Sequence, residues 1–148
     1  MNKAYLISHH WELVREETHI LATTFRVPSD AGRWLLSHRY ASYPDEQFGV
    51  MLLNTRNQII LCDIVSKGSL NGSLVHPSRV FKSAIVENAA GVICFHNHPS
   101  GDLTPSREDL ALTKRLREAG KHIGIELLDH VILSPQGTYV SLKEKELL

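Results

Sequence analysis

Residues 91–120 read GVICFHNHPSGDLTPSREDLALTKRLREAG, and this stretch decides the fold. Its first part, GVICFH, is a short apolar run that predicts a buried strand ending near His96. After the loop NHPSGDL, Thr104 and Pro105 have the form of a helix N-cap followed by proline at the first helical position. SREDLALTKRLREA then predicts a helix that stops at Gly120. A strand followed directly by a helix is typical of folds in which helices pack on a sheet.

The segments on both sides of this stretch continue the alternation of strands and helices. Upstream, QFGVMLL and QIILCDIVS are apolar runs separated by the turn-like residues 54–57, which predicts a hairpin. His76-Pro77 opens a second predicted helix that ends before Gly91, with apolar residues at helical spacing: Val80, Phe81, Ala84, Ile85 and Ala89. Downstream we expect strands near 123–128 and 131–133, and a Gln136-Gly137 turn before TYVS. The predicted fold class is α/β (α+β), with a central mixed β-sheet flanked by helices.

The N-terminal part predicts an appendage of this domain rather than a second domain. Residues 11–20, WELVREETHI, have the pattern of a polar edge strand, and the Pro-Ser-Asp of residues 28–30 starts a helix over AGRWLLSHRY. The sequence shows no repeat, low-complexity tract or Gly/Ser/Pro-rich linker. We therefore expect residues 1–40 to pack on a domain formed by residues 41–148.

Composition limits the compartment and the partners of the chain. Its 148 residues carry sixteen basic and sixteen acidic side chains, so net charge does not favour a polyanion such as DNA. Cys62 and Cys94 lie inside apolar runs and are interpreted as small buried hydrophobic residues, which suits a reducing cytoplasm. No apolar run approaches the roughly 18 residues that span a bilayer, and the N-terminus is charged where a signal peptide is apolar. A cytoplasmic protein without a membrane span is expected.

Three residues have the types and the spacing of a zinc site. His96 and His98 lie two apart at the end of the predicted strand, so in extended backbone their side chains point to the same side. Asp109 falls in the first turn of the following helix, which the Pro-Ser-Gly turn after His98 can fold back over the strand end. Two imidazoles and one carboxylate leave the fourth tetrahedral position of zinc open for water, as in catalytic sites.

Ser106 is the candidate oxyanion stabiliser, because it lies three residues before Asp109 at the start of the helix, where N–H groups point outward. Each feature also has a plainer interpretation. An isolated H-x-H is more often a pair of loop histidines, Ser106 is a good first-turn residue, and Asp109 could merely complement the helix dipole. The combined pattern H-x-H-x(7)-S-x-x-D is far more restrictive. The zincin motif H-E-x-x-H and the nucleobase-deaminase motif are both missing from the sequence.

Three stretches of the chain resemble the RadC family, whose domain belongs to the JAMM (MPN-type) zinc metalloprotease superfamily. They are EQFGVMLLN, HPSRVFKSAIVENAAGVICFHNHPSGDLTPSREDLALTKRL and LLDHVIL. The resemblance covers about two thirds of the chain, and it implies zinc ligands at His96, His98 and Asp109 with Ser106 as oxyanion stabiliser. It also implies that Glu46 is the general base. Spacing alone does not choose this residue over the other glutamates, which are Glu87, Glu108 and Glu126.

The chain departs from the family pattern at two places. The family's N-terminal helix-hairpin-helix region, which suggests DNA contact, is not expected here because the segment before Glu46 is too short for it. The family's HPRE reads His76-Pro77-Ser78-Arg79, which moves the arginine about 100° around a helix. Asp129-His130 matches the family's DH pair and is interpreted as supporting or structural. The other histidines are expected at the surface: His9, His10, His19, His38 and His122.

The leading functional hypothesis is a zinc-dependent hydrolase that cleaves a peptide or isopeptide bond of a protein substrate through water activated by Glu46. One alternative is a DNA repair-associated module whose zinc site is structural or acts on phosphodiesters. Another is a non-catalytic interaction domain. The interaction domain is the weakest of the three, because all five expected site residues are present: Glu46, His96, His98, Ser106 and Asp109.

Overall fold

A computed structural model describes residues 23–68 and 75–148. The predicted edge strand at 11–20 lies outside the described residues, as do His9, His10 and His19. Of the predicted N-terminal appendage, only residues from 23 onward are described, so the boundary after residue 40 stays a prediction.

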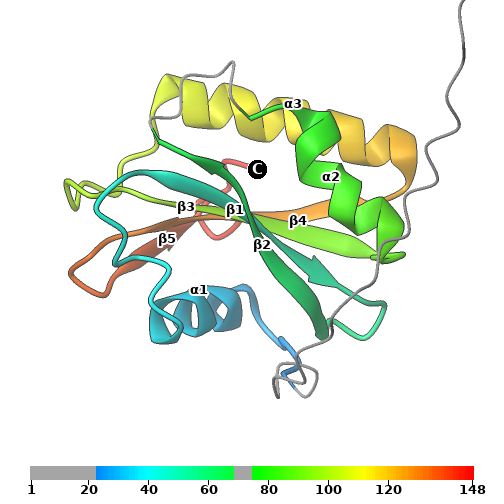
Figure 1. The fold of residues 1–148 in the computed structure, drawn as a ribbon, viewed down its shortest axis with the longest axis horizontal. Helices are drawn as coiled ribbons and strands as arrows, with labels where there is room; N and C mark the ends of the chain where they lie inside the picture. Colours follow the sequence, from blue (N-terminus) through cyan, green and yellow to red (C-terminus); the bar gives the residue numbers. More distant parts are fainter. Residues whose placement is uncertain (1–22, 69–74) are drawn as a thin grey trace, which may run out of the picture.

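A five-stranded sheet in the order β2-β1-β3-β4-β5 forms the centre of the molecule (Figure 1). The strands are β1 (Gln47–Leu53), β2 (Ile59–Lys67), β3 (Gly91–Asn97), β4 (Glu126–Leu133) and β5 (Tyr139–Ser141). β1 pairs antiparallel with β2 and β3, β3 pairs parallel with β4, and β4 pairs antiparallel with β5. The sheet is therefore mixed, and the predicted fold class is confirmed.

Three helices cover the two faces of this sheet (Figure 1). They are α1 (Pro28–Ser37), α2 (Pro77–Val86) and α3 (Arg107–Ile123). α2 and α3 lie on one face and α1 on the other. α3 connects β3 to β4, because two parallel strands need a crossover connection and a helix is its usual form.

Alternate residues of the strands separate two apolar cores. Even-numbered side chains of β1 and β3 pack with α2 and α3, in a cluster that includes Phe48, Val50, Leu52, Val92, Cys94, Leu112 and Leu116. Odd-numbered ones pack with α1, in a second cluster that includes Ala31, Leu35, Met51, Leu53, Ile93 and Phe95. This two-residue period is the geometry of a strand buried on both faces. It places the even-numbered His96 on the face that α3 covers.

The predicted bounds of α3 are wrong at both ends. Ser106, not Thr104, is the N-cap, and its hydroxyl accepts a hydrogen bond from the N–H of Asp109 at 3.0 Å. The helix also continues through Gly120 to Ile123, and its C-cap is Gly124, which has the left-handed φ of 76°. A Cβ on Gly120 would lie 2.3 Å from the carbonyl oxygen of Ile125. Glycine is thus required there by close backbone approach rather than by a helix end.

β4 is one continuous strand, whereas the sequence predicted a break around Asp129 and His130. The strand tolerates this polar pair because the buried Asp129 carboxylate is fully engaged. It accepts hydrogen bonds from the N–H groups of His130 and Lys143 and from the Ser141 hydroxyl, at 2.7, 3.0 and 2.6 Å. α2 begins after its N-cap His76 as predicted, but it ends at Val86, so Ala89 lies beyond the helix.

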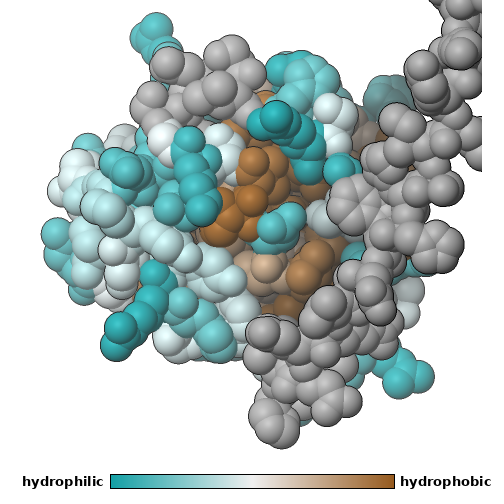
Figure 2. Space-filling view, in the orientation of Figure 1, coloured by the Kyte–Doolittle hydropathy of each residue, from teal (hydrophilic) through white to brown (hydrophobic). Residues whose placement is uncertain are grey.

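On the face shown in Figure 2, the coloured surface is mostly polar around an apolar area near the centre. Exposed apolar side chains among the described residues include Leu61 on β2 and Ile85 and Val86 on α2. Of the two cysteines, Cys94 is fully buried as predicted, and Cys62 is half-buried. Within residues 23–68 and 75–148, no helix combines the length and the apolar character that crossing a bilayer requires.

Candidate metal centre

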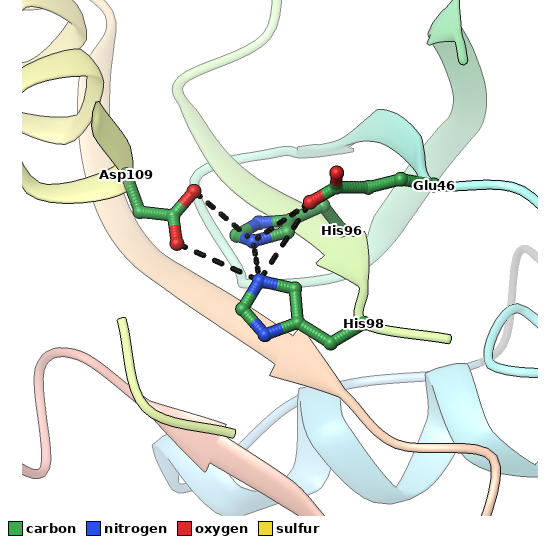
Figure 3. A group of neighbouring side chains, drawn as sticks. All are labelled: Glu46, His96, His98 and Asp109. Atoms are coloured by element: carbon green, nitrogen blue, oxygen red, sulfur yellow. Dashed lines mark hydrogen bonds and ion pairs between the residues drawn. The ribbon is translucent and has the colours of Figure 1, made fainter. Parts of the chain in front are cut away.

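Glu46, His96, His98 and Asp109 converge on one point at the C-terminal end of the central strand β3 (Figure 3). One ligand atom from each side chain lies within 4.8 Å of the others. The residues come from three places: the segment before β1, the end of β3 and the first turn of α3. The structure thus brings together all three predicted ligands and the predicted general base.

β3 aims the two imidazoles at the same side. His96 is the penultimate residue of the strand, and His98 follows it with its backbone still tied to the sheet, since its N–H donates to the Leu133 carbonyl at 2.8 Å. The two Nε2 atoms lie 2.8 Å apart. The Nδ1 atom of His98 lies 2.5 Å from the Asp102 carbonyl oxygen, which can only accept, so Nδ1 carries the hydrogen and Nε2 faces the site.

The carboxylate of Asp109 serves both the helix and the site. In the capping box of α3, its Oδ2 accepts the Ser106 N–H at 2.8 Å. Its Oδ1 lies 3.3 Å from Nε2 of His96, and Oδ2 lies 3.5 Å from Nε2 of His98. Burial opposes ionisation, but the imidazoles of His96 and His98, which lie against the carboxylate and donate to it when they are protonated, outweigh burial and hold the pKa of this carboxyl well below its usual range. The side chain of Asp109 is therefore an anion at neutral pH and can serve as a metal ligand.

Asn97 positions the segment that carries Glu46, and sequence reasoning missed it. Its amide donates to the backbone carbonyls of Tyr43 and Asp45, both at 3.1 Å, and its Oδ1 accepts the N–H of Gln47 at 2.8 Å. These bonds hold the backbone on both sides of Glu46 against the end of β3. The available signal in the sequence is an asparagine between two candidate ligands at the end of a predicted buried strand, where its amide needs partners.

Glu46 stands farther from the imidazoles than Asp109 does. Its Oε1 lies 3.9 Å from Nε2 of His96 and 3.7 Å from Nε2 of His98. Its side chain is 25% exposed, whereas that of Asp109 is 3% exposed. This partly open position is the one expected of a group that exchanges protons with water.

The donor set fits a zinc ion. Ligand atoms held tetrahedrally about 2.0–2.2 Å from zinc lie roughly 3.3–3.6 Å from one another. The five separations that involve an imidazole Nε2 atom, from 2.8 to 3.9 Å, bracket that range. Two carboxylates facing two imidazoles also place a formal charge of about −2 around the point when the imidazoles are neutral, which suits a divalent cation.

The remaining predicted residues lie around this group or away from it. His130 is fully buried against His96, and burial lowers the pKa of its ring well below the usual value. Asp129 has no ligand atom in the four-residue group and binds backbone groups instead, which agrees with a structural role. His38, Arg79 and His122 are exposed. Ser106 is also exposed, at the N-cap of α3.

Comparison with known proteins relates this chain to a family of bacterial proteins. A family model described as "RadC-like JAB domain" matches residues 25–147. A UPF0758 protein of Geobacillus kaustophilus is 54% identical over 121 residues, which are 81% of this chain and 52% of that protein. A UPF0758 protein of Shouchella clausii is 45% identical over 148 residues, which are 98% of this chain and 64% of that protein. The chain spans about half the length of several curated relatives that it matches.

Proposed function

Because the chain belongs to the RadC-like JAB domain family, we propose that it is a zinc-dependent hydrolase that cleaves a peptide or isopeptide bond. The observation that carries this proposal is the position of Glu46, whose Oε1 lies within 4 Å of both imidazole Nε2 atoms. A carboxylate at this place serves proton transfer, while a purely structural site needs only a closed set of ligands.

Each residue has a role in this mechanism. His96, His98 and Asp109 would hold the zinc ion. When bound, zinc supplies a Lewis acid that lowers the pKa of a water molecule from 15.7 to about 7. Glu46 accepts the proton of the attacking water and later delivers it to the leaving amine. The partial exposure of Glu46 gives both water and substrate access to its carboxylate.

Ser106 is proposed to stabilise the developing oxyanion. Its Oγ accepts the Asp109 N–H at 3.0 Å, which leaves the hydroxyl hydrogen for donation. The side chain is exposed at the start of α3, next to the capping-box partner that belongs to the metal group. A serine here can therefore cap the helix and donate to a substrate oxygen at the same time.

Substitution of Ser106 separates these two roles. Glycine is a nearly equal N-cap, so Ser106→Gly is expected to change the unfolding free energy by only a few tenths of a kcal/mol, whereas Ser106→Ala should cost about 1 kcal/mol. Both variants lose the hydroxyl, and removal of one oxyanion donor lowers kcat by about 10²–10³-fold. Urea unfolding and hydrolysis assays on both variants measure the two effects. Full activity in Ser106→Gly would contradict the oxyanion role.

The decisive experiment is hydrolysis by the zinc-loaded protein. Peptides, isopeptide-linked proteins, and single- and double-stranded DNA form the panel, with chelator-treated protein as the control. We expect cleavage of a peptide or isopeptide bond, and its loss on chelation with little change in circular dichroism, because two apolar cores hold the fold away from the metal. Cleavage of DNA alone would favour the DNA repair-associated alternative, and zinc binding without any cleavage would favour an interaction domain.

A further inference from the structure

A chain of buried hydrogen bonds runs behind His96 and returns to the backbone of Asp109. Nδ1 of His96 lies 2.8 Å from Nε2 of His130, and Nδ1 of His130 lies 2.6 Å from the Thr113 hydroxyl oxygen. That oxygen lies 2.7 Å from the Asp109 carbonyl oxygen. His96, His130 and Thr113 are at most 1% exposed. The chain thus links two of the candidate metal ligands from the side opposite to the metal.

The carbonyl at the end, together with a neutral His130 ring, fixes the direction of every bond in this chain. A carbonyl oxygen has no hydrogen, so the single hydrogen of the Thr113 hydroxyl must point to Asp109. Nδ1 of His130 must then donate its own hydrogen to Thr113. A ring buried as fully as this one stays neutral, because burial disfavours the charged form. Nε2 of His130 is therefore an acceptor, and Nδ1 of His96 carries the hydrogen.

We propose that His130 and Thr113 are positioning residues that hold His96 in the Nδ1–H tautomer, so that its Nε2 lone pair always faces the metal. The proposal rests on the zinc site of the proposed function, but the tautomer itself is a property of the metal-free protein. Neither residue contacts substrate in this role. They act only through the ring of His96.

Both histidine ligands are oriented by an Nδ1–H hydrogen bond that leads to a backbone carbonyl, but the groups between the ring and the carbonyl differ. His98 donates directly to a backbone carbonyl, that of Asp102, at 2.5 Å. His96 reaches a backbone carbonyl only through His130 and Thr113. A carbonyl terminus is a permanent acceptor, whereas a hydroxyl or imidazole terminus can reverse direction. The hydrogen bonds behind His96 can therefore be removed by substituting Thr113 or His130, which leaves every candidate metal ligand unchanged.

A first experiment reads the tautomer of His96 in metal-free wild-type protein by long-range ¹H–¹⁵N nuclear magnetic resonance. We expect hydrogen on Nδ1 of both His96 and His130. A His96 ring with bare Nδ1 would overturn the proposal. This measurement needs neither zinc nor a substrate, so its result is independent of whether the protein hydrolyses anything.

A second experiment compares zinc affinity by chelator competition in Thr113→Val and Thr113→Ser. Valine keeps the shape but removes the hydroxyl, and loss of such supporting hydrogen bonds typically weakens metal affinity by about 10–100-fold. Serine restores the hydroxyl and is expected to restore the wild-type affinity and the His96 tautomer. Leu116→Val on the same helix disturbs the core without touching the chain, and its zinc affinity should match that of wild type.

Wild-type affinity in Thr113→Val would overturn the proposal, as would a Thr113→Ser variant that is as weak as Thr113→Val. Circular dichroism of the metal-free variants shows that each one folds. If Thr113→Val does not fold, the wild-type tautomer measurement still decides. A protein that shows the expected tautomer and affinities but hydrolyses nothing would support the positioning role and contradict only the proposed catalytic function.

Discussion

Glu46→Gln is expected to lower hydrolysis by about 10²–10⁴-fold while zinc content and fold stay unchanged. Glutamine has nearly the same shape as glutamate but cannot accept a proton from water. Oε1 of Glu46 lies 3.7 Å from Nε2 of His98 and 3.9 Å from Nε2 of His96, farther than the Asp109 oxygens do. Replacing this carboxylate by an amide therefore leaves the three candidate ligands in place. Single-turnover hydrolysis and metal analysis on the same samples measure the two quantities.

Glu126→Gln is the matched control for Glu46→Gln. Glu126 is exposed at the start of β4, a strand position paired with Gly91 at the start of β3, while the metal group lies at the other end of β3. The same loss of charge there is expected to leave hydrolysis unchanged. If Glu46→Gln kept full activity on a substrate that the wild type cleaves, another residue would be the base.

His98→Ala is expected to reduce bound zinc from about one ion per chain to nearly none, because two remaining ligands cannot hold zinc against solvent. His96→Ala should have the same effect on zinc. His98 is the cleaner test, because its side chain is 14% exposed and its Nδ1 bonds to a backbone carbonyl, whereas loss of the fully buried His96 would leave Nε2 of the buried His130 without its partner. Metal analysis after dialysis, with circular dichroism of each variant, measures the outcome.

His122→Ala is the control for this prediction. His122 lies exposed in the last turn of α3, far along the helix from Asp109 in its first turn. The zinc content of the His122→Ala variant should equal that of wild type. Unchanged zinc in both His96→Ala and His98→Ala, with folded protein in each case, would overturn the ligand assignment.

The local part of the site could be predicted from sequence spacing, because its geometry depends on a single strand and a single helix turn. His96 and His98 share a side through the two-residue period of extended backbone, and Asp109 reaches them from the next element. Glu46 could not be found in this way. It approaches only because β1 pairs antiparallel with β3, in a register that sets Phe48 opposite His96. That pairing is a long-range property, and only the family resemblance pointed to it.

The errors in the predicted elements have a common origin in tertiary contacts. Gly120 has the sequence signature of a helix end, but the approach of the Ile125 carbonyl explains it. Asp129-His130 looks like a break in a strand, but buried partners satisfy both side chains. The role of Thr113 was equally hidden, since a threonine within a helix gives no sign of the ring that lies against it. Local propensity describes such residues poorly when another element supplies their partners.

If Asp109 binds the metal as proposed, its carboxylate ties the lifetime of the bound ion to the motion of a helix end. Helix termini are the first regions of a folded protein to open, and such local openings need far less free energy than global unfolding. In this protein the first turn of α3 is closed by the same side chain that faces the imidazoles. Fraying of that turn would withdraw a candidate ligand, and a bound metal would in turn oppose the fraying. Ion release and amide hydrogen exchange at the start of α3 are therefore expected to report on one and the same opening event.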